Sequence, residues 1–209
     1  MTTLVIGANG QIGRQFCERA RRAGEPVKAM VRREEQAEWF AERGIDTVVA
    51  DLEGDFTHAF DGCDEVLFTA GSGPHTGPEK TLLIDLYGAM RAVDIAAEKG
   101  VERFIMVSAI RAEDPMAAPE KLRPYMAAKY AADAHLRQAT VPHAILKPGR
   151  LVDEPASERF AASVEEAGEN RISRDNVAVA LLHTVQQKAL ANAEFTLLDG
   201  ERGVADVMA

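Results

Sequence analysis

Short apolar runs alternate with longer stretches of helical spacing as far as residue 149. The apolar runs contain few polar positions, which is typical of strands buried on both faces of a parallel sheet. The pattern predicts strands over residues 4–6, 27–31, 46–50, 65–69, 103–108 and 143–147. It predicts helices over residues 11–23, 34–43, 81–99 and 122–139, and three of them end at Gly24, Gly44 and Gly100. Glycine commonly ends a helix because it adopts the left-handed conformation without strain.

The alternation of strand and helix predicts the fold class. Parallel strands joined by right-handed crossovers form an α/β protein. We therefore expect a Rossmann-type α/β fold with a doubly wound parallel sheet, in a three-layer α/β/α arrangement. After Gly149 the pattern weakens to a helix over residues 174–187, with Ser173 as its N-cap, and a strand over residues 194–198. Because no repeat or linker divides the chain, we expect one domain over residues 1–209, in which residues 150–209 form a small substrate-side region.

Composition narrows the class of protein further. The chain has 24 basic and 33 acidic residues and a formal net charge of −9, which disfavours binding to nucleic acid. No signal peptide and no apolar run of membrane-spanning length is recognisable, so we expect a cytoplasmic protein without a membrane partner. Two cysteines and five histidines show no metal-ligand spacing, so we expect no metal site.

The strongest local signal is the sequence GANGQIG at residues 7–13. It follows a predicted strand and opens a predicted helix, which is the context of a dinucleotide-binding turn. Gly7 allows a sharp turn, Gly10 leaves room for a pyrophosphate against the backbone, and Gly13 lets helix and strand pack closely. The intervening residues Asn9, Gln11 and Ile12 belong to the same expected cofactor contact. The alternative is a tight turn that holds no ligand.

The residues after the second and third predicted strands favour NADP(H), with NAD(H) possible. Arg32 and Arg33 stand where many NAD enzymes carry an acidic residue, and two guanidinium groups can hold a 2′-phosphate. They could also be ordinary surface arginines. Asp51 and Leu52 stand where an adenine ring is expected, although Asp51 could be a simple turn residue.

A tyrosine and a lysine four residues apart are the candidate catalytic group. Tyr125 and Lys129 share one face of a predicted helix, so their polar ends can converge, and the cation is expected to lower the pKa of the phenol. Ser108 ends the fifth predicted strand, from which its hydroxyl could bond the substrate or Tyr125. Lys129 can also hold the nicotinamide ribose. This spacing is common by chance, and only its position after the glycine turn raises its significance.

Further loops follow strand ends and are expected to line the same crevice. Ala70, Gly71 and Ser72 could approach a nucleotide ribose. The segment 147–150, which consists of Lys147, Pro148, Gly149 and Arg150, could face the nicotinamide amide. Residues 74–78, with His75, form either a lid or an ordinary surface loop.

These motifs together resemble an atypical member of the short-chain dehydrogenase/reductase superfamily. GANGQIGR, VRR, DL, VSA, YMAAKYAAD, KPGRL and ISRDNVA occur in the expected order. The chain is similar to small bacterial NAD(P)-binding, NmrA-like or epimerase-like proteins, and more distantly to biliverdin/flavin reductases. The resemblance implies NADP(H) in the crevice, a catalytic group of Ser108, Tyr125 and Lys129, and segment 147–150 near the nicotinamide.

Three functions are compatible with this sequence. The first is an NADP(H)-dependent oxidoreductase that acts on a small carbonyl, quinone or flavin-like substrate. The second is a non-catalytic NADP(H)-binding redox sensor, and the third is an epimerase or dehydratase that retains its NAD(P). The substrate is expected to be a small molecule, and both a monomer and a dimer remain compatible with the sequence.

Overall fold

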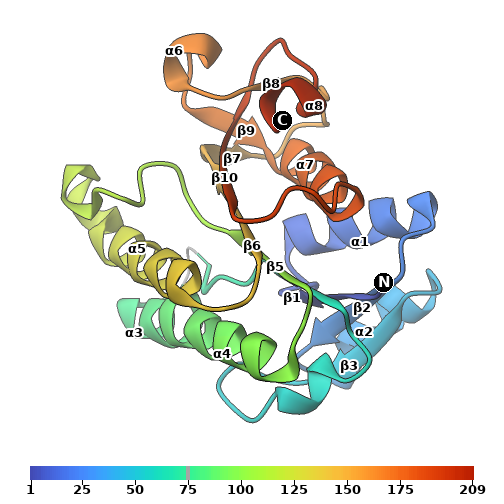
Figure 1. The fold of residues 1–209 in the computed structure, drawn as a ribbon. Helices are drawn as coiled ribbons and strands as arrows, with labels where there is room; N and C mark the ends of the chain where they lie inside the picture. Colours follow the sequence, from blue (N-terminus) through green and yellow to red (C-terminus); the bar gives the residue numbers. More distant parts are fainter. Residues whose placement is uncertain (74–75) are drawn as a thin grey trace.

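An eight-stranded sheet forms the centre of the computed structural model, which describes residues 1–73 and 76–209 (Figure 1). Its strand order is β3-β2-β1-β4-β5-β6-β10-β8, and all neighbours are parallel except β8, which is antiparallel to β10. The strands are β1 (Thr3–Ile6), β2 (Val27–Val31), β3 (Asp46–Val49), β4 (Glu65–Phe68), β5 (Arg103–Val107), β6 (His143–Pro148), β8 (Phe160–Ala161) and β10 (Ala193–Asp199). The predicted Rossmann-type fold is confirmed.

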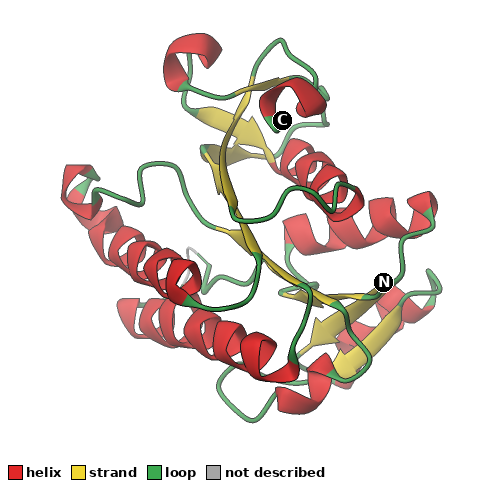
Figure 2. Cartoon of the chain, in the orientation of Figure 1, coloured by secondary structure: helices red, strands yellow, loops and turns green. Residues whose placement is uncertain are grey.

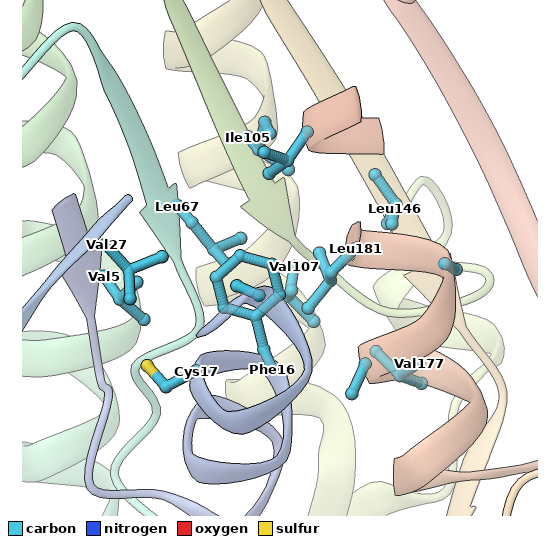
Figure 3. Packing of buried hydrophobic residues seen from close by; sticks show 14 of the residues in the cluster. Val5, Phe16, Cys17, Val27, Leu67, Ile105, Val107, Leu146, Val177 and Leu181 are labelled. Atoms are coloured by element: carbon cyan, nitrogen blue, oxygen red, sulfur yellow. The ribbon is translucent and has the colours of Figure 1, made fainter. Parts of the chain in front are cut away.

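Helices cover both faces of this sheet (Figure 2). Helices α1 (Gln11–Ala23), α2 (Glu34–Ala41) and α7 (Arg174–Gln186) pack on one face, and α4 (Ala89–Lys99) and α5 (Arg123–Gln138) on the other. Alternate residues of β1 pack into two hydrophobic cores, one on each face of the sheet. Val5 packs in the first core, which includes Phe16 and Leu181 (Figure 3), and Leu4 and Ile6 pack in the second. The central strands are mostly apolar because both of their faces are buried.

Several helix ends follow from the sequence as predicted. Gly24 and Gly100 both adopt the left-handed conformation after α1 and α4. The Ser173 side chain accepts a hydrogen bond from the backbone N–H of Asn176 at the start of α7, so the predicted N-cap is confirmed.

The predicted helix over residues 81–99 is not one regular α-helix. The structure has a short helix α3 (Pro78–Lys80), a π-helix η2 (Thr81–Gly88), and then α4. Hydrophobic spacing does not separate these types here, because eight residues are too few to distinguish a π-helical period from an α-helical one.

The segment after Gly149 holds elements that the sequence did not predict. Strands β7 (Arg150–Val152) and β9 (Arg171–Ser173) form a separate parallel pair, and α6 (Val164–Ala167) and α8 (Val204–Val207) are short helices. The same segment also contributes to the main domain core, since α7 packs against α1 and β10 joins the large sheet. The remaining short helices are η1 (Thr57–Phe60), η3 (Pro115–Ala117) and η4 (Glu120–Leu122). Within the described residues, no helix is long and apolar enough to cross a membrane.

A buried ion pair ties the sheet to the end of α7. The Arg103 guanidinium on β5 lies 2.5 Å from a carboxylate oxygen of Glu65 on β4, and both side chains are nearly inaccessible. Arg103 also donates to the backbone carbonyl of Thr184 at 2.7 Å and to that of Gln187 at 2.9 Å. The hydroxyl of Thr3 donates to the second carboxylate oxygen of Glu65 at 3.1 Å. Every charged atom of the pair is therefore compensated inside the protein.

Replacing one partner of this pair should destabilise the fold strongly. Arg103→Met leaves the Glu65 carboxylate buried without its guanidinium partner and removes the donor from four backbone carbonyls, so we expect the free energy of unfolding to fall by about 3–5 kcal/mol. Urea denaturation monitored by circular dichroism measures this change. The control is Arg22→Met, since Arg22 is 75% exposed and its pair with Glu18 is 3.7 Å long. Equal stability of the two variants would show that the buried pair contributes nothing.

Candidate cofactor and catalytic site

The turn between β1 and α1 packs directly against the loop after β4. Gly7 has φ +90°, and a Cβ atom on it would lie 2.5 Å from the backbone nitrogen of Ala70. A Cβ atom on Gly13 would lie 2.4 Å from the carbonyl oxygen of Gly7. These two glycines are therefore required by the packing of the chain itself. Gly10 differs, because a Cβ atom there would meet only the Gly7 oxygen at 3.3 Å.

The N-terminus of α1 is open to an anion. Gly10 is the N-cap residue, no side chain caps the helix, and its first turn carries no acidic residue. The first amides of a helix lack partners within the helix and carry the positive end of its dipole, so they suit phosphate oxygens. The side-chain oxygen of Asn9 accepts from the Arg14 guanidinium at 2.5 Å, and Arg14 lies 4.7 Å from the centre of the Trp39 ring. These contacts hold a cation beside the turn.

A cavity of about 350 Å³ opens beside this turn, at the carboxyl ends of β1 to β4. It is lined by nine of the residues that the sequence predicts for the cofactor, namely Gly7, Asn9, Gly10, Arg32, Asp51, Leu52, Ala70, Gly71 and Ser72. Its lining residues and the uncapped helix end beside it fit the adenosine and pyrophosphate half of a dinucleotide. Gln11, Ile12 and Gly13 belong to the first turn of α1 beside it.

The cavity wall at β2 and β3 is the part of the predicted cofactor site that would face an adenosine ribose. Both arginines are exposed, but only Arg32 lines the cavity, whereas Arg33 is the N-cap residue of α2. The Gln36 side chain also lines it and accepts from the backbone N–H of Arg32 at 2.9 Å, which leaves its amide group as a donor. Sequence reasoning missed Gln36 because a polar residue in the first turns of a helix carries no distinctive signal. Asp51 accepts from the backbone N–H of Glu53 at 3.0 Å, so one of its oxygens stabilises a turn.

The predicted lid lies partly outside the described residues. This applies to residues 74–75, and with them to His75. Thr76 lines the cavity, and its hydroxyl donates to the carbonyls of Ser72 and Gly73, each at 3.1 Å. An ion pair between Lys80 and Glu53, 2.6 Å long, stands at the same rim.

The predicted catalytic residues come together between β5 and α5. Ser108 follows β5 and is 2% exposed, and Lys129 on α5 is 3% exposed. The Lys129 ammonium donates to the carbonyl of Val107 at 3.1 Å and lies 5.7 Å from the centre of the Tyr125 ring. Two buried carboxylates, Asp85 and Asp133, complete this cluster, and sequence reasoning missed both. The spacing of Asp133, four residues after Lys129, could have indicated it.

The Ser108 hydroxyl is engaged differently from the sequence-based expectation. It donates to a carboxylate oxygen of Asp133 at 2.6 Å, so its hydrogen is committed to Asp133 and not to Tyr125 or a substrate. The serine oxygen keeps its lone pairs and can still accept a hydrogen bond. Burial raises the pKa of Asp133, while the bond from Ser108 and the nearby Lys129 act in the opposite direction.

The prediction of a lowered pKa for Tyr125 is wrong, because the net shift of this pKa is upward. Burial raises the pKa of the Tyr125 phenol above its usual range, and the attraction of Lys129 only partly offsets this. For Lys129 itself, burial disfavours the charged form, but Tyr125, Asp85 and Asp133 outweigh burial and raise its pKa. At neutral pH the phenol is therefore neutral and the ammonium is charged.

Segment 147–150 is tied into the C-terminal part of the sheet. The Lys147 ammonium lies 2.7 Å from Glu194 on β10, and the same carboxylate binds Arg137 on α5. The hydrogen bond from Arg137 is the main reason why the pKa of Glu194 falls to about 2. Pro148 is buried, and a Cβ atom on Gly149 would lie 2.4 Å from the Leu198 side chain. Arg150 is exposed on β7. Their proximity to a nicotinamide ring stays a prediction, and the Lys147 charge is already neutralised by Glu194.

Other chemistry has no support in the described part of the chain. No group of three or more His, Cys, Asp or Glu side chains there could hold a metal ion. Both cysteines are free, and burial raises the pKa of the Cys17 thiol to about 12. A thiol with so high a pKa is not a nucleophile at neutral pH.

Comparison with known proteins places this site in a family. A family model described as NAD(P)H-binding matches residues 7–188, so the chain belongs to the NAD(P)H-binding family. It is 39% identical to the "Uncharacterized sugar epimerase YhfK" of Bacillus subtilis, over 100% of this chain and 99% of the relative. It also matches the solved structure of a "Putative NAD-dependent epimerase/dehydratase from Bacillus halodurans", with 40% identity, a TM-score of 0.95, and coverage of 100% and 98% of the two chains. The anaerobillin reductase ChuY of Escherichia coli O157:H7 shares the fold, with 20% identity, a TM-score of 0.77, and coverage of 95% and 97%.

The glycine turn allows the cofactor contact to be tested separately from the fold. Gly10→Ala should place a methyl group where the pyrophosphate approaches, while meeting the chain itself only at 3.3 Å. We expect the dissociation constant for NADPH to rise at least about tenfold, or ~1.4 kcal/mol, with little change in melting temperature. Fluorescence titration with NADPH and with NADH measures the affinity. Gly13→Ala is the comparison, since its methyl group collides with the Gly7 carbonyl and should lower the melting temperature. Unaltered NADPH binding by Gly10→Ala would contradict the assignment of the turn.

Proposed function

We propose that the protein is an NADP(H)-dependent oxidoreductase that reduces a small carbonyl, quinone or flavin-like substrate. The observation that carries the proposal is the pair of the half-buried Tyr125 and the buried Lys129 on one face of α5. This pair is connected to the cofactor cavity through Asp85, which contacts both Lys129 and the backbone of Ser72. Membership of the NAD(P)H-binding family supports the cofactor class.

In this proposal the cofactor supplies a hydride, and the side chains of the chain handle the proton. Tyr125 carries its hydrogen at neutral pH, as a phenol with an ordinary pKa also does, so it can protonate a substrate oxygen, although burial raises its pKa and makes it a weaker acid. Lys129 stays charged and stabilises the phenolate that results. Ser108 offers oxygen lone pairs to a donor group of the substrate, since its own hydrogen is held by Asp133.

We further propose a preference for NADP(H) over NAD(H). Arg32 lines the cavity at the end of β2, where the 2′-position of the adenosine ribose is expected. A guanidinium group there can bind a 2′-phosphate through charge-assisted hydrogen bonds. The amide of Gln36 offers a second donor at the same wall.

A second candidate function is an epimerase or dehydratase that keeps its cofactor bound. The printed names of YhfK and of the Bacillus halodurans protein favour it. Such an enzyme returns its hydride to the same substrate, so it should purify with NAD(P) bound, whereas a reductase must exchange its cofactor in every turnover. The absorbance of the purified protein, and of an acid extract from it, shows whether NAD(P) is bound and so separates the two candidates.

Removing the Arg32 charge should abolish the cofactor preference. Because a hydrogen bond to a charged group contributes about 1.5–3 kcal/mol, Arg32→Gln should weaken NADPH binding by roughly 10–100-fold and change NADH binding by less than about twofold. Titration of the variant and of the wild type with NADPH and with NADH measures these changes in affinity. The matched control is Arg33→Gln, which alters a neighbouring arginine outside the cavity lining and should have a smaller effect. Equal affinity of the wild type for both cofactors would contradict the NADP(H) assignment.

Removing the Tyr125 hydroxyl should slow carbonyl reduction without affecting cofactor binding. General acid catalysis contributes about 10²–10⁴-fold, so Tyr125→Phe should lower kcat by that factor. The measurement is NADPH oxidation with a panel of carbonyls, quinones and flavins. Tyr130→Phe is the control, because Tyr130 is exposed on the same helix. Undiminished turnover in Tyr125→Phe would exclude Tyr125 as the proton donor, and a wild type that binds NADPH but reduces nothing would favour the redox sensor.

A further inference from the structure

Two arginines lie level with each other at the carboxyl edge of the sheet, where β5 and β6 end. The ladder between these strands continues beyond β5, because the backbone N–H of Ile110 donates to the carbonyl of Pro148 at 2.9 Å (Figure 1). Since the register of the two strands is kept, Arg111 is level with Arg150. Arg111 follows Ser108 by three residues, so both arginines belong to the edge of the sheet that carries the catalytic cluster.

The backbone at Arg111 has a conformation that arginine rarely adopts. Its φ is +61°, in the left-handed region, which costs free energy for any residue with a Cβ atom. Glycine would avoid this cost. Residues that keep such strain cluster at active sites and ligand-binding positions. The strain therefore indicates that the Arg111 side chain has a function that glycine could not supply.

Both arginines are exposed and carry charges that the protein does not pair. Among the residues that the structure describes, neither Arg111 nor Arg150 forms an ion pair with a carboxylate. A third arginine differs, because Arg171 lies beside Arg150 in the β7–β9 pair but is neutralised. Its guanidinium lies 2.9 Å from Glu154 and 3.0 Å from Glu169. Arg111 and Arg150 are thus available to an anionic ligand.

Arg111 faces the C-terminal part of the chain, which the sequence predicts to be the substrate side. Hydrogen bonds in the first turn of α6 lower the pKa of Glu165, and the attraction of Arg111 adds to this effect. Arg111 therefore extends from the end of β5 towards α6, while Arg150 comes from β7. The two charges approach the substrate side from different segments of the chain.

An exposed apolar surface continues the face of α5 that carries Tyr125. Leu122 precedes Tyr125 by three residues and Lys129 by seven, so the three side chains share one face. Leu122 is 50% exposed, and Met116 on η3, which packs against α5, is 68% exposed. The face thus passes from a buried lysine to a phenol and then to exposed apolar side chains. Such a surface suits the apolar body of an acceptor.

We propose that the acceptor carries an anionic group, a carboxylate or a phosphate, on an apolar body, and that Arg111 and Arg150 bind this anionic group. The inference deepens the proposed function, because it names the substrate class of the same site. A chain with a net charge of −9 repels anions over most of its surface, so an anionic substrate needs local cations. Guanidinium groups suit both anions, since they form charge-assisted, bidentate hydrogen bonds to carboxylate and to phosphate.

Two matched pairs of compounds isolate the contribution of the anionic group. 4-Formylbenzoate is compared with its methyl ester, and FMN with riboflavin, so the two pairs also distinguish carboxylate from phosphate. Calorimetric titration of protein saturated with NADP⁺ measures binding without turnover, because no hydride is available. We expect the wild type to bind the anionic member of at least one pair about tenfold or more tightly than the neutral member. High salt should reduce this ratio, because the arginines are exposed.

Single variants test each arginine in turn. Arg111→Asn removes the charge without adding strain, since asparagine adopts the left-handed conformation more readily than most residues. Arg111→Asn and Arg150→Gln should each lower the affinity ratio by about threefold or more, and their combination should abolish it. A ratio within one pair of compounds cancels any general effect of a variant on the site. Arg111→Lys and Arg150→Lys keep the charge and should retain part of the ratio. Arg22→Gln is the control, since Arg22 is an exposed arginine in the last turn of α1.

Several outcomes would overturn the inference. Equal affinity of the wild type for both members of each pair would do so, and so would a ratio that survives in the double variant. A loss of NADPH affinity in Arg150→Gln would assign Arg150 to the cofactor and would remove it from the substrate site. The failure of the proposed function looks different: protein that binds the anions through these arginines but oxidises no NADPH with any acceptor would leave the inference intact. Reduction of neutral and anionic acceptors with equal efficiency would leave only the proposed function intact.

Discussion

Backbone-to-backbone packing at the ends of β1 and β4 is the constraint on which the site depends. The turn at Gly7 lies so close to Ala70 that no side chain fits between them, and Gly13 lies equally close to the Gly7 carbonyl. This packing aims the first amides of α1 at the crevice where the loops after β1 to β4 meet. Carboxyl ends of parallel strands converge there because every crossover returns the chain to the same edge of the sheet. The position of the cavity is thus a consequence of the topology, and the glycines permit it.

A second constraint is electrostatic and lies on the opposite face of the sheet. Lys129 is almost fully buried, which by itself would favour the neutral amine. It stays charged because Asp85 approaches from η2 and Asp133 from its own helix. The cost of burying these charges is offset only while the groups stay together, and this restricts how α5, η2 and β5 can move relative to one another.

The sequence predicted the regular parts of the fold and the residues whose role follows from the backbone. Apolar runs and helix-ending glycines located the main strands and helices, since burial on both faces and left-handed turns restrict residue type strongly. The glycine turn at residues 7–13 and the cavity beside it were predictable for a similar reason, because close backbone packing restricts these positions to glycine. The sequence did not predict the π-helix, because eight residues are too few to reveal a period different from that of an α-helix. It also did not predict Asp85 and Asp133, because the contacts of a buried aspartate depend on segments far away in the chain.

The error about Tyr125 shows which effect decides in this site. Sequence spacing correctly brought an ammonium close to the phenol, and proximity alone would lower the pKa of the phenol. Spacing contains no information on burial, and burial has the larger effect here. The phenol carries its hydrogen at neutral pH, as an ordinary tyrosine does, and the charged neighbour would stabilise the anion left behind after proton donation. This order suits reduction of an acceptor, in which the substrate oxygen gains a proton as its carbon gains a hydride.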